Sequence, residues 1–149
     1  MDVPIGYLDS SALVKRYVKE RGSDVVASLF RKAYDGDAAI AFSIYNIGEV
    51  LTAFDKAARR QGREELYYRL KRLFLGEVRR MIRLKICRLV PANTSVLKAS
   101  WSYIEKHHIY AADALQIASA KYVGSSVFYT GDEALCEAAR GEGLKCVLL

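Results

Sequence analysis

Four acidic residues that are far apart in the sequence occupy comparable places beside apolar segments. Asp9 ends the apolar run 5–9, and Asp132 follows the run 126–130, so each stands between an expected strand and an expected helix. Glu49 lies about two turns into an expected helix, and Asp113 lies in the first turn of another. Helix amino termini favour carboxylates, so Asp9 and Asp132 taken alone are equally explained as helix caps and Asp113 as a first-turn residue.

Brought together, the four carboxylates would repel one another strongly. At about 5 Å and an effective dielectric near 20, each ionised pair costs roughly 3 kcal/mol, against a total stability of about 5–15 kcal/mol. Either some of the acids are protonated or a hard divalent cation lies among them. All-oxygen ligation suits Mg²⁺ or Mn²⁺. Such an ion activates water for the hydrolysis of a phosphodiester.

The acids depend for their positions on alternating strands and helices. Apolar runs predict five strands, at 5–9, 39–42, 86–90, 126–130 and 144–149. The segments between them predict helices, at 10–20, 23–34, 43–60, 63–85, 94–107, 111–123 and 132–140. This pattern is typical of a three-layer α/β/α sandwich with a central parallel sheet. Ligands of such sheets bind beyond the carboxyl ends of the strands, where Asp9 and Asp132 are expected.

Local signals refine three of the helices. Ser10 or Ser11 is the expected N-cap of the first helix, and Asn93 or Thr94 that of the helix ending near 107. The long helix 63–85 is amphipathic, with an apolar side made of Leu66, Leu70, Leu73 and Phe74.

Size and composition indicate one compact domain spanning 1–149. The chain has 149 residues, is 52% hydrophobic and 27% charged, and contains no apolar stretch near the roughly 20 residues that a membrane span needs. It also lacks a signal-peptide pattern, so we expect a cytoplasmic protein with no membrane contact. The three cysteines are odd in number and show no CxxC spacing, which predicts buried thiols rather than disulfides or a zinc site.

Positive charge is concentrated in one segment. The formal net charge is +6, and twelve of the 23 lysines and arginines lie between Lys56 and Arg88, against three acids. A polyanionic partner such as RNA fits this excess of charge. A solvated helix surface explains it equally well.

Three further positions are candidates for supporting roles. Lys15 lies within two turns of Asp9 and is a candidate contact for a substrate phosphate, although an exposed helix lysine is the simpler interpretation. Asn46 precedes Glu49 by one turn and is a candidate partner of a metal-bound water or a carboxylate. His107 and His108 are adjacent and point about 100° apart on a helix, which favours a helix-end role over paired acid-base catalysis.

Four segments of the chain resemble the PIN domains, and among these the VapC-type toxins of toxin-antitoxin pairs. They are "YLDSSALVKRYV", "SIYNIGEVLTAF", "AADALQIASA" and "VFYTGDEALCEAA". Their order and spacing span nearly the whole chain. Two positions depart from the family pattern: Gln116 stands where the family often has His, and "TGD" replaces the commoner "TAD".

The resemblance implies a metal-dependent endoribonuclease, with Mg²⁺ or Mn²⁺ bound by Asp9, Glu49, Asp113 and Asp132. Asp9 and Asp113 would be the more direct ligands. Ser10 and Thr130 match positions that shape the site. The resemblance also implies a homodimer and an antitoxin whose tail covers the active-site groove, and the apolar side chains considered for these contacts are Leu13, Val14 and Tyr17.

Two other classes of protein were weighed. A phosphoacceptor receiver domain needs an aspartate at the end of strand three and a lysine at the end of strand five, but these strands end "RLVPAN" and "CVLL". A catalytically inactive or housekeeping RNA-binding or RNA-processing module is the stronger alternative. The presence of all four acids argues against lost chemistry.

Overall fold

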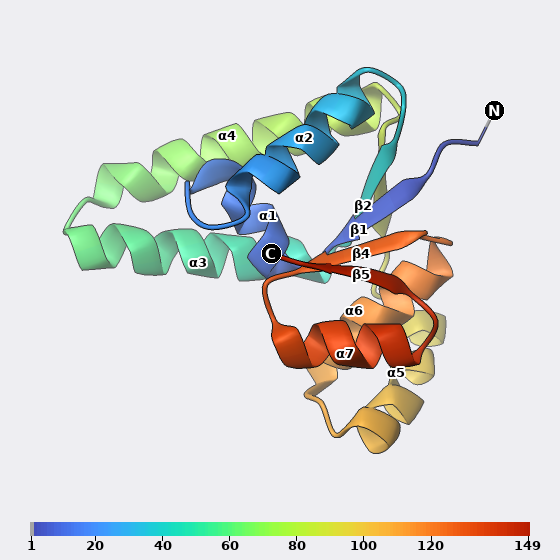
Figure 1. The fold of residues 1–149 in the computed structure, drawn as a ribbon. Helices are drawn as coiled ribbons and strands as arrows, with labels where there is room; N and C mark the ends of the chain where they lie inside the picture. Colours follow the sequence, from blue (N-terminus) through green and yellow to red (C-terminus); the bar gives the residue numbers. More distant parts are fainter. Residues whose placement is uncertain (1) are drawn as a thin grey trace.

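The protein, described here over residues 2–149 of a computed structural model, alternates strands and helices along its length (Figure 1). The strands are β1 (Ile5–Leu8), β2 (Ala39–Ser43), β3 (Cys87–Val90), β4 (Val127–Thr130) and β5 (Lys145–Leu148). The helices are α1 (Ser10–Tyr17), α2 (Ser23–Tyr34), α3 (Tyr45–Gln61), α4 (Glu64–Arg83), α5 (Thr94–His107), α6 (Ala111–Tyr122) and α7 (Glu133–Gly141).

The five strands form one parallel sheet in the order β3-β2-β1-β4-β5. This confirms the predicted α/β fold with its central parallel sheet. β1 lies at the centre, where Tyr7 pairs with Ala41 on one side and Phe128 on the other. Between β1 and β4 the strand order reverses direction. The carboxyl ends of these two strands therefore bound the crevice in which ligands of open α/β sheets bind.

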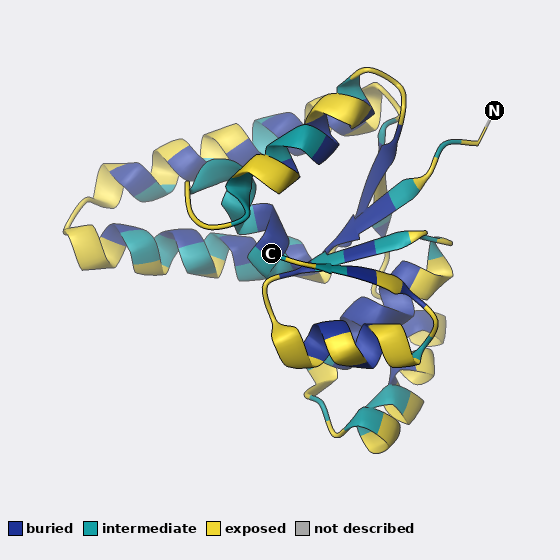
Figure 2. Ribbon diagram, in the orientation of Figure 1, coloured by how far each residue is buried: buried dark blue, intermediate teal, exposed yellow. Residues whose placement is uncertain are grey.

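Helices cover both faces of the sheet and bury a separate apolar core on each side (Figures 1 and 2). One core lies under α1 to α4 and includes Leu8, Phe30, Phe42, Phe54 and Phe74. The other lies under α6 and α7 and includes Tyr7, Ile117, Phe128 and Leu135. Side chains alternate between faces along a strand, so neighbouring Tyr7 and Leu8 serve opposite cores. No helix within residues 2–149 has the length and apolar character needed to cross a membrane.

Three local predictions differ from the structure. Asp9, not Ser10 or Ser11, caps α1, because its carboxylate accepts from the Ala12 backbone N–H. That helix ends at Tyr17 rather than near residue 20. Leu73 was expected on the buried side of α4 but is 56% exposed, since the buried stripe passes through its neighbour Phe74 instead. The predicted Asn93 cap of α5 is confirmed.

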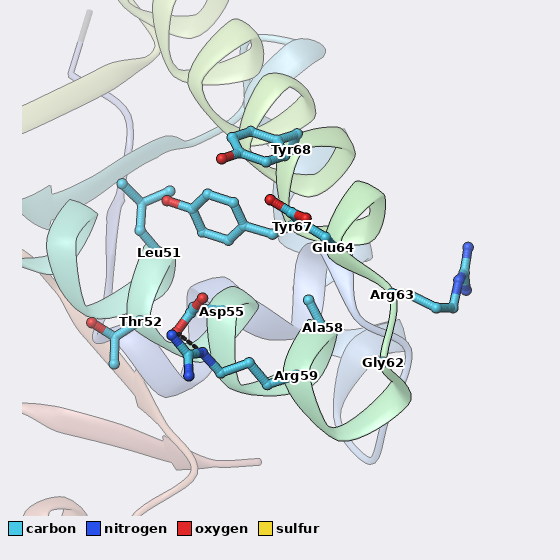
Figure 3. Close-up of a pocket in the computed structure, with 10 residues that line it drawn as sticks. All are labelled: Leu51, Thr52, Asp55, Ala58, Arg59, Gly62, Arg63, Glu64, Tyr67 and Tyr68. Atoms are coloured by element: carbon cyan, nitrogen blue, oxygen red, sulfur yellow. Dashed lines mark hydrogen bonds and ion pairs between the residues drawn. The ribbon is translucent and has the colours of Figure 1, made fainter.

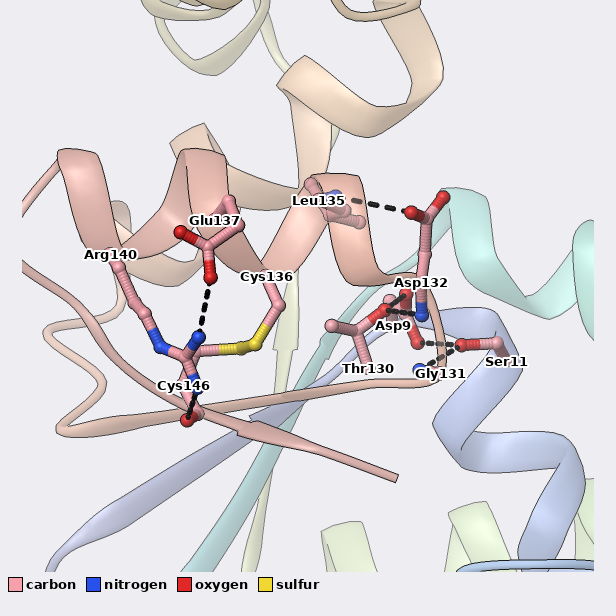
Figure 4. Close-up of a disulfide and its surroundings, with 10 residues drawn as sticks. All are labelled: Asp9, Ser11, Thr130, Gly131, Asp132, Leu135, Cys136, Glu137, Arg140 and Cys146. Carbon is pink, nitrogen blue, oxygen red and sulfur yellow. Dashed lines mark hydrogen bonds and ion pairs between the residues drawn. A yellow bond between two sulfur atoms is a disulfide. The ribbon is translucent and has the colours of Figure 1, made fainter.

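The prediction of three thiols is wrong for two of the cysteines. Cys136 of α7 and Cys146 of β5 form a disulfide, with 5.7 Å between their Cα atoms (Figure 4). Cys87 is free and buried. The two bonded residues are only ten apart in sequence, and the packing of α7 against β5 brings them together. Spacing alone missed them because a separation of ten residues matches no CxxC pattern and the pair depends on how α7 packs against β5.

Candidate functional site at the carboxyl edge of the sheet

Four acids from four elements gather around the point where the strand order reverses. Asp9 follows β1 directly, and its backbone N–H donates to the Tyr129 carbonyl of β4. Asp132 follows β4, Glu49 lies in the second turn of α3, and Asp113 lies in the first turn of α6. We call Asp9, Glu49, Asp113 and Asp132 the acid rim.

Asp9 is the buried member of the acid rim, with 5% of its surface exposed. Its Oδ1 accepts from the Ser11 hydroxyl at 2.6 Å and from the Ala12 backbone N–H at 2.9 Å, and its Oδ2 accepts from the Thr130 hydroxyl. Burial raises the pKa of Asp9, the hydrogen bonds from Ser11 and Thr130 oppose that shift, and the charge of Asp132 adds to it. The pKa of Asp9 is therefore raised overall, because the groups that donate to it are neutral hydroxyls and a backbone amide.

The loop after β4 is tied to Asp9 through hydroxyl groups (Figure 4). Thr130, which is fully buried, donates to Asp9 and accepts from the Asp132 backbone N–H at 3.0 Å. The Gly131 backbone N–H donates to the Ser11 hydroxyl at 2.9 Å. Asp132 caps α7 by accepting from the Leu135 backbone N–H at 3.1 Å. The ends of β1 and β4 are thus held together by a chain of polar contacts.

Glu49 and Asp113 are the half-buried members of the acid rim, and neither caps a helix. Burial raises the pKa of Glu49; a hydrogen bond from Ser10 opposes this, and the charges of Asp9 and Asp113 reinforce it. Burial likewise raises the pKa of Asp113, together with the charges of Asp132 and Asp9. The four carboxylates therefore lie within electrostatic reach of one another.

The oxygen donors of the acid rim suit a divalent cation, but the four carboxylates do not converge on one point in the way that a bound ion would require. No group of three or more His, Cys, Asp or Glu side chains in residues 2–149 stands ready to hold a metal ion. Two of the carboxylates, Asp9 and Asp132, are turned toward the helix N–H groups that they cap. No ion pair within that range involves an acid of the rim. Its negative charge is therefore not neutralised by a direct ion pair among these residues, and hard oxygen donors suit Mg²⁺ or Mn²⁺.

Of the four residues predicted to support the site, two contact the acid rim and two bond to other groups. Thr130 and Ser10 contact acids of the rim, as described above. The Lys15 ammonium forms an ion pair with Glu20 at 3.1 Å, so a substrate phosphate would have to compete for it. Asn46 is fully buried, and its side-chain amide bonds to Gln116 and to the Leu8 carbonyl rather than to a carboxylate.

Ser11 and Gln116 are the site-supporting residues that sequence reasoning missed. Ser11 belongs to the quoted "LDSS" motif, but only the first serine was considered as a shaping residue. Gln116 was noted as a departure from a family pattern, without a contact. A polar residue within the apolar run "ALQIASA" is the signal that could have singled it out, because buried polar side chains require partners.

The basic segment does not form a single surface beside the acid rim. α3 begins at the carboxyl edge of the sheet and leads away from it, and α4 returns to the start of β3 (Figure 1). Arg83, Lys85 and Arg88 therefore lie toward the opposite edge of the sheet from Asp9. The positive residues nearer the turn, including Arg59 and Arg63, project with the α3–α4 hairpin.

That hairpin encloses an open hollow of about 700 Å³ (Figure 3). Tyr67 and Tyr68 of α4 and the ion-paired Asp55 and Arg59 of α3 are among its lining residues. No member of the acid rim lines it. It holds no set of residues suited to hydrolysis, and the acid rim remains the candidate reaction site.

The chain belongs to the PIN domain family, whose sequence model matches residues 6–141. This range includes every member of the acid rim. Comparison with curated proteins finds no match.

Several solved structures share the fold at low sequence identity. FitAcB from Neisseria gonorrhoeae superposes with a TM-score of 0.66 at 18% identity, covering 95% of each chain. VapC20 from Mycobacterium tuberculosis, a toxin that cleaves the sarcin-ricin loop, gives 0.61 at 15% identity, covering 89% of this chain and 94% of that one. VapBC2 from Rickettsia felis, bound to a DNA fragment from its promoter, gives 0.61 at 15% identity over 97% and 98%.

Proposed function

We propose that the protein is a metal-dependent endoribonuclease, the toxin of a type II toxin-antitoxin pair, acting in the cytoplasm. One observation supports this most directly: a buried aspartate at the ligand crevice of the sheet lies within electrostatic reach of three more acids, and none of the four forms an ion pair within residues 2–149. Membership of the PIN family and the likeness to VapC20 support nuclease chemistry.

Asp9, Glu49, Asp113 and Asp132 would hold Mg²⁺ or Mn²⁺. When bound, the ion supplies a water of lowered pKa and neutralises charge on the phosphate. Ser11 and Thr130 orient the Asp9 carboxylate through their hydroxyl groups.

Glu49 and Asp113 are the residues to which we assign orientation of the attacking water. Neither is engaged as a helix cap, so their carboxylates are free of the backbone contacts that hold Asp9 and Asp132.

We propose two partners, a cognate antitoxin and a second copy of the chain. The resemblance of the sequence to VapC-type toxins supports the antitoxin, and VapC20, which is a toxin, shares the fold. Leu13 was considered for these contacts but is fully buried, so it serves the core instead. Val14 and Tyr17 are half-buried and stay candidates. Co-purification with the product of a small neighbouring reading frame would test the antitoxin.

The test of the nuclease is RNA cleavage by purified protein with Mg²⁺ or Mn²⁺, with and without chelator. We expect cleavage to require the ion and to fall by about a thousandfold in Asp9→Asn and Asp113→Asn, the scale of a metal's several kcal/mol of transition-state stabilisation. Asp55→Asn is the matched control, because Asp55 lies outside the acid rim on the α3–α4 hairpin. Cleavage that survives both chelator and the two substitutions would reject the mechanism.

A second measurement separates the attacking groups. RNA with a single 2′-deoxy substitution at the cut site should still be cleaved by water, whereas attack by the internal 2′-hydroxyl would be abolished. Binding of RNA without cleavage under any divalent ion would favour the inactive RNA-binding alternative.

A further inference from the structure

Beneath the acid rim, three buried polar side chains from three elements form a closed hydrogen-bond network. The Tyr7 hydroxyl of β1 donates to Gln116 Oε1 of α6 at 2.7 Å. The amides of Gln116 and Asn46 pair reciprocally, with Gln116 Nε2 to Asn46 Oδ1 at 2.6 Å and Asn46 Nδ2 to Gln116 Oε1 at 2.9 Å. Tyr7 and Asn46 are fully buried and Gln116 is 2% exposed.

Each part of this network stands close in sequence to an acid of the rim. Asn46 precedes Glu49 by three residues on α3, and Gln116 follows Asp113 by three residues on α6. Residues three apart lie on the same side of a helix. Asn46 Nδ2 also donates to the Leu8 carbonyl at 3.3 Å, immediately before Asp9. The network therefore joins the three backbone segments that carry Asp9, Glu49 and Asp113.

The hydrogen bonds of the network are directional and interdependent. Gln116 Oε1 accepts from both Tyr7 and Asn46, so a shift of either α3 or α6 would break the reciprocal amide pair. Apolar side chains would fill the same space but tolerate sliding, whereas a satisfied polar network specifies one arrangement.

Repulsion between the acids of the rim opposes the arrangement that the network holds. Their mutual repulsion, seen in the charges that act on Glu49 and Asp113, favours separation of α3, α6 and the end of β1. The amide pair bridges the two helices one turn below those same acids. Groups behind metal ligands commonly set the affinity of a site in this manner.

We propose that Tyr7, Asn46 and Gln116 are positioning residues that fix the spacing of Asp9, Glu49 and Asp113 and thereby set the affinity of the acid rim for a divalent ion. This inference rests on the proposed metal-dependent function. The three residues touch neither substrate nor ion, and they act through the backbone segments that they join.

The test measures Mn²⁺ binding by titration calorimetry on the full chain, with thermal unfolding of each variant recorded in parallel. Gln116→Met keeps the length of the side chain and removes its hydrogen bonds, and we expect Mn²⁺ to bind about tenfold more weakly, the lower end of the range for groups that support metal ligands. Tyr7→Phe removes one hydroxyl and should weaken binding in the same direction.

Tyr17→Phe is the matched control for Tyr7→Phe. The Tyr17 hydroxyl donates to Glu77 at 2.7 Å, the same length as the bond from Tyr7, but in the other core. Both variants should lose stability, while only Tyr7→Phe should lose Mn²⁺ affinity. The double variant Asn46→Gln with Gln116→Asn restores the amide pair at the same total length and should recover affinity relative to either single variant.

The outcomes separate the two claims. Wild-type Mn²⁺ affinity in a folded Gln116→Met or Tyr7→Phe protein, or an equal loss in Tyr17→Phe, would overturn the positioning role and leave the nuclease proposal intact. If Gln116→Met fails to fold, Tyr7→Phe decides. A wild-type protein that neither binds Mn²⁺ nor cleaves RNA would overturn the proposed function and the positioning role with it.

Discussion

Two buried carboxylates in this protein have opposite surroundings. Glu77 of α4 is 7% exposed and Asp9 is 5% exposed, yet only Glu77 has a cation. Arg16 donates to both oxygens of Glu77 at 3.0 and 2.9 Å, and the hydroxyls of Tyr17 and Tyr34 add two more bonds. The Arg16 guanidinium also lies 4.5 Å from the ring centre of Phe30.

The consequence appears in the direction of each pKa. Burial alone would raise the pKa of Glu77, but the bonds from Arg16 and Tyr17 outweigh it and hold the pKa below its usual range. Burial raises the pKa of Asp9 beyond what hydroxyl and amide donors offset. Arg16 thus neutralises Glu77, whereas Asp9 is bonded by neutral donors only. That difference separates an acid used for stability from one available to an external cation.

The largest expected effect is on stability and concerns Glu77. Glu77→Gln leaves the half-buried Arg16 without its anionic partner, and because Glu77 itself is buried we expect a cost of about 3 kcal/mol, the lower end of the range for a broken buried pair. Urea unfolding monitored by circular dichroism should show that loss in the free energy of unfolding. A loss below about 1 kcal/mol, typical of exposed ion pairs, would remove the contrast with Asp9.

The pH dependence of that loss has a definite sign. Because the folded pKa of Glu77 lies below the usual glutamate value of 4.5, the unfolded chain binds more protons between the two values. The stabilisation from Glu77 is therefore present above about pH 4.5 and disappears as the pH falls through the folded pKa. The difference between wild type and Glu77→Gln should shrink over that interval.

The second effect uses a divalent ion to distinguish the two acids. Mn²⁺ at about 100 times its dissociation constant should raise the free energy of unfolding of the wild type by about 2.7 kcal/mol. Glu77→Gln should show the same increment from its lower starting point, because Glu77 lies outside the acid rim. Asp9→Asn should lose most of it. Equal increments in all three proteins would place the ion elsewhere.

The sequence predicted the arrangement of the sheet better than the partners of its buried polar groups. Asp9 and Asp132 could be placed at one edge because parallel strands share the direction of their carboxyl ends. Glu77 was counted only as one acid within a basic segment, since its partners Arg16, Tyr17 and Tyr34 come from α1 and α2. Contacts of this kind depend on how helices pack, which local periodicity does not encode.

The amide pair of Asn46 and Gln116 was out of reach for the same reason. These residues are 70 apart in sequence, and the direction of each side chain depends on the helix axis and on the sheet between them. The disulfide between Cys136 and Cys146 likewise required α7 and β5 to be packed first. The charge of the segment 56–88 was correct as a count, but the α3–α4 hairpin divides it in space.

The smallest effect has the opposite sign to the first. In the absence of divalent ions, Asp9→Asn should stabilise the protein by roughly 1–2 kcal/mol, the size of one or two partly screened carboxylate repulsions. Asparagine caps helices as well as aspartate, so its oxygen can still accept from Ser11 and Ala12, and its amide can donate to the Thr130 hydroxyl. Because these contacts are kept, the relief of repulsion with Glu49 and Asp113 is the main change in the free energy of unfolding.

Unfolding in chelator at neutral pH, with Asp55→Asn as an exposed-acid control, measures this gain. A destabilised Asp9→Asn protein would mean that the Asp9 charge already contributes to folding, as that of Glu77 does. In that case groups of the protein would already compensate the charge of the acid rim, and the rim would not need a cation.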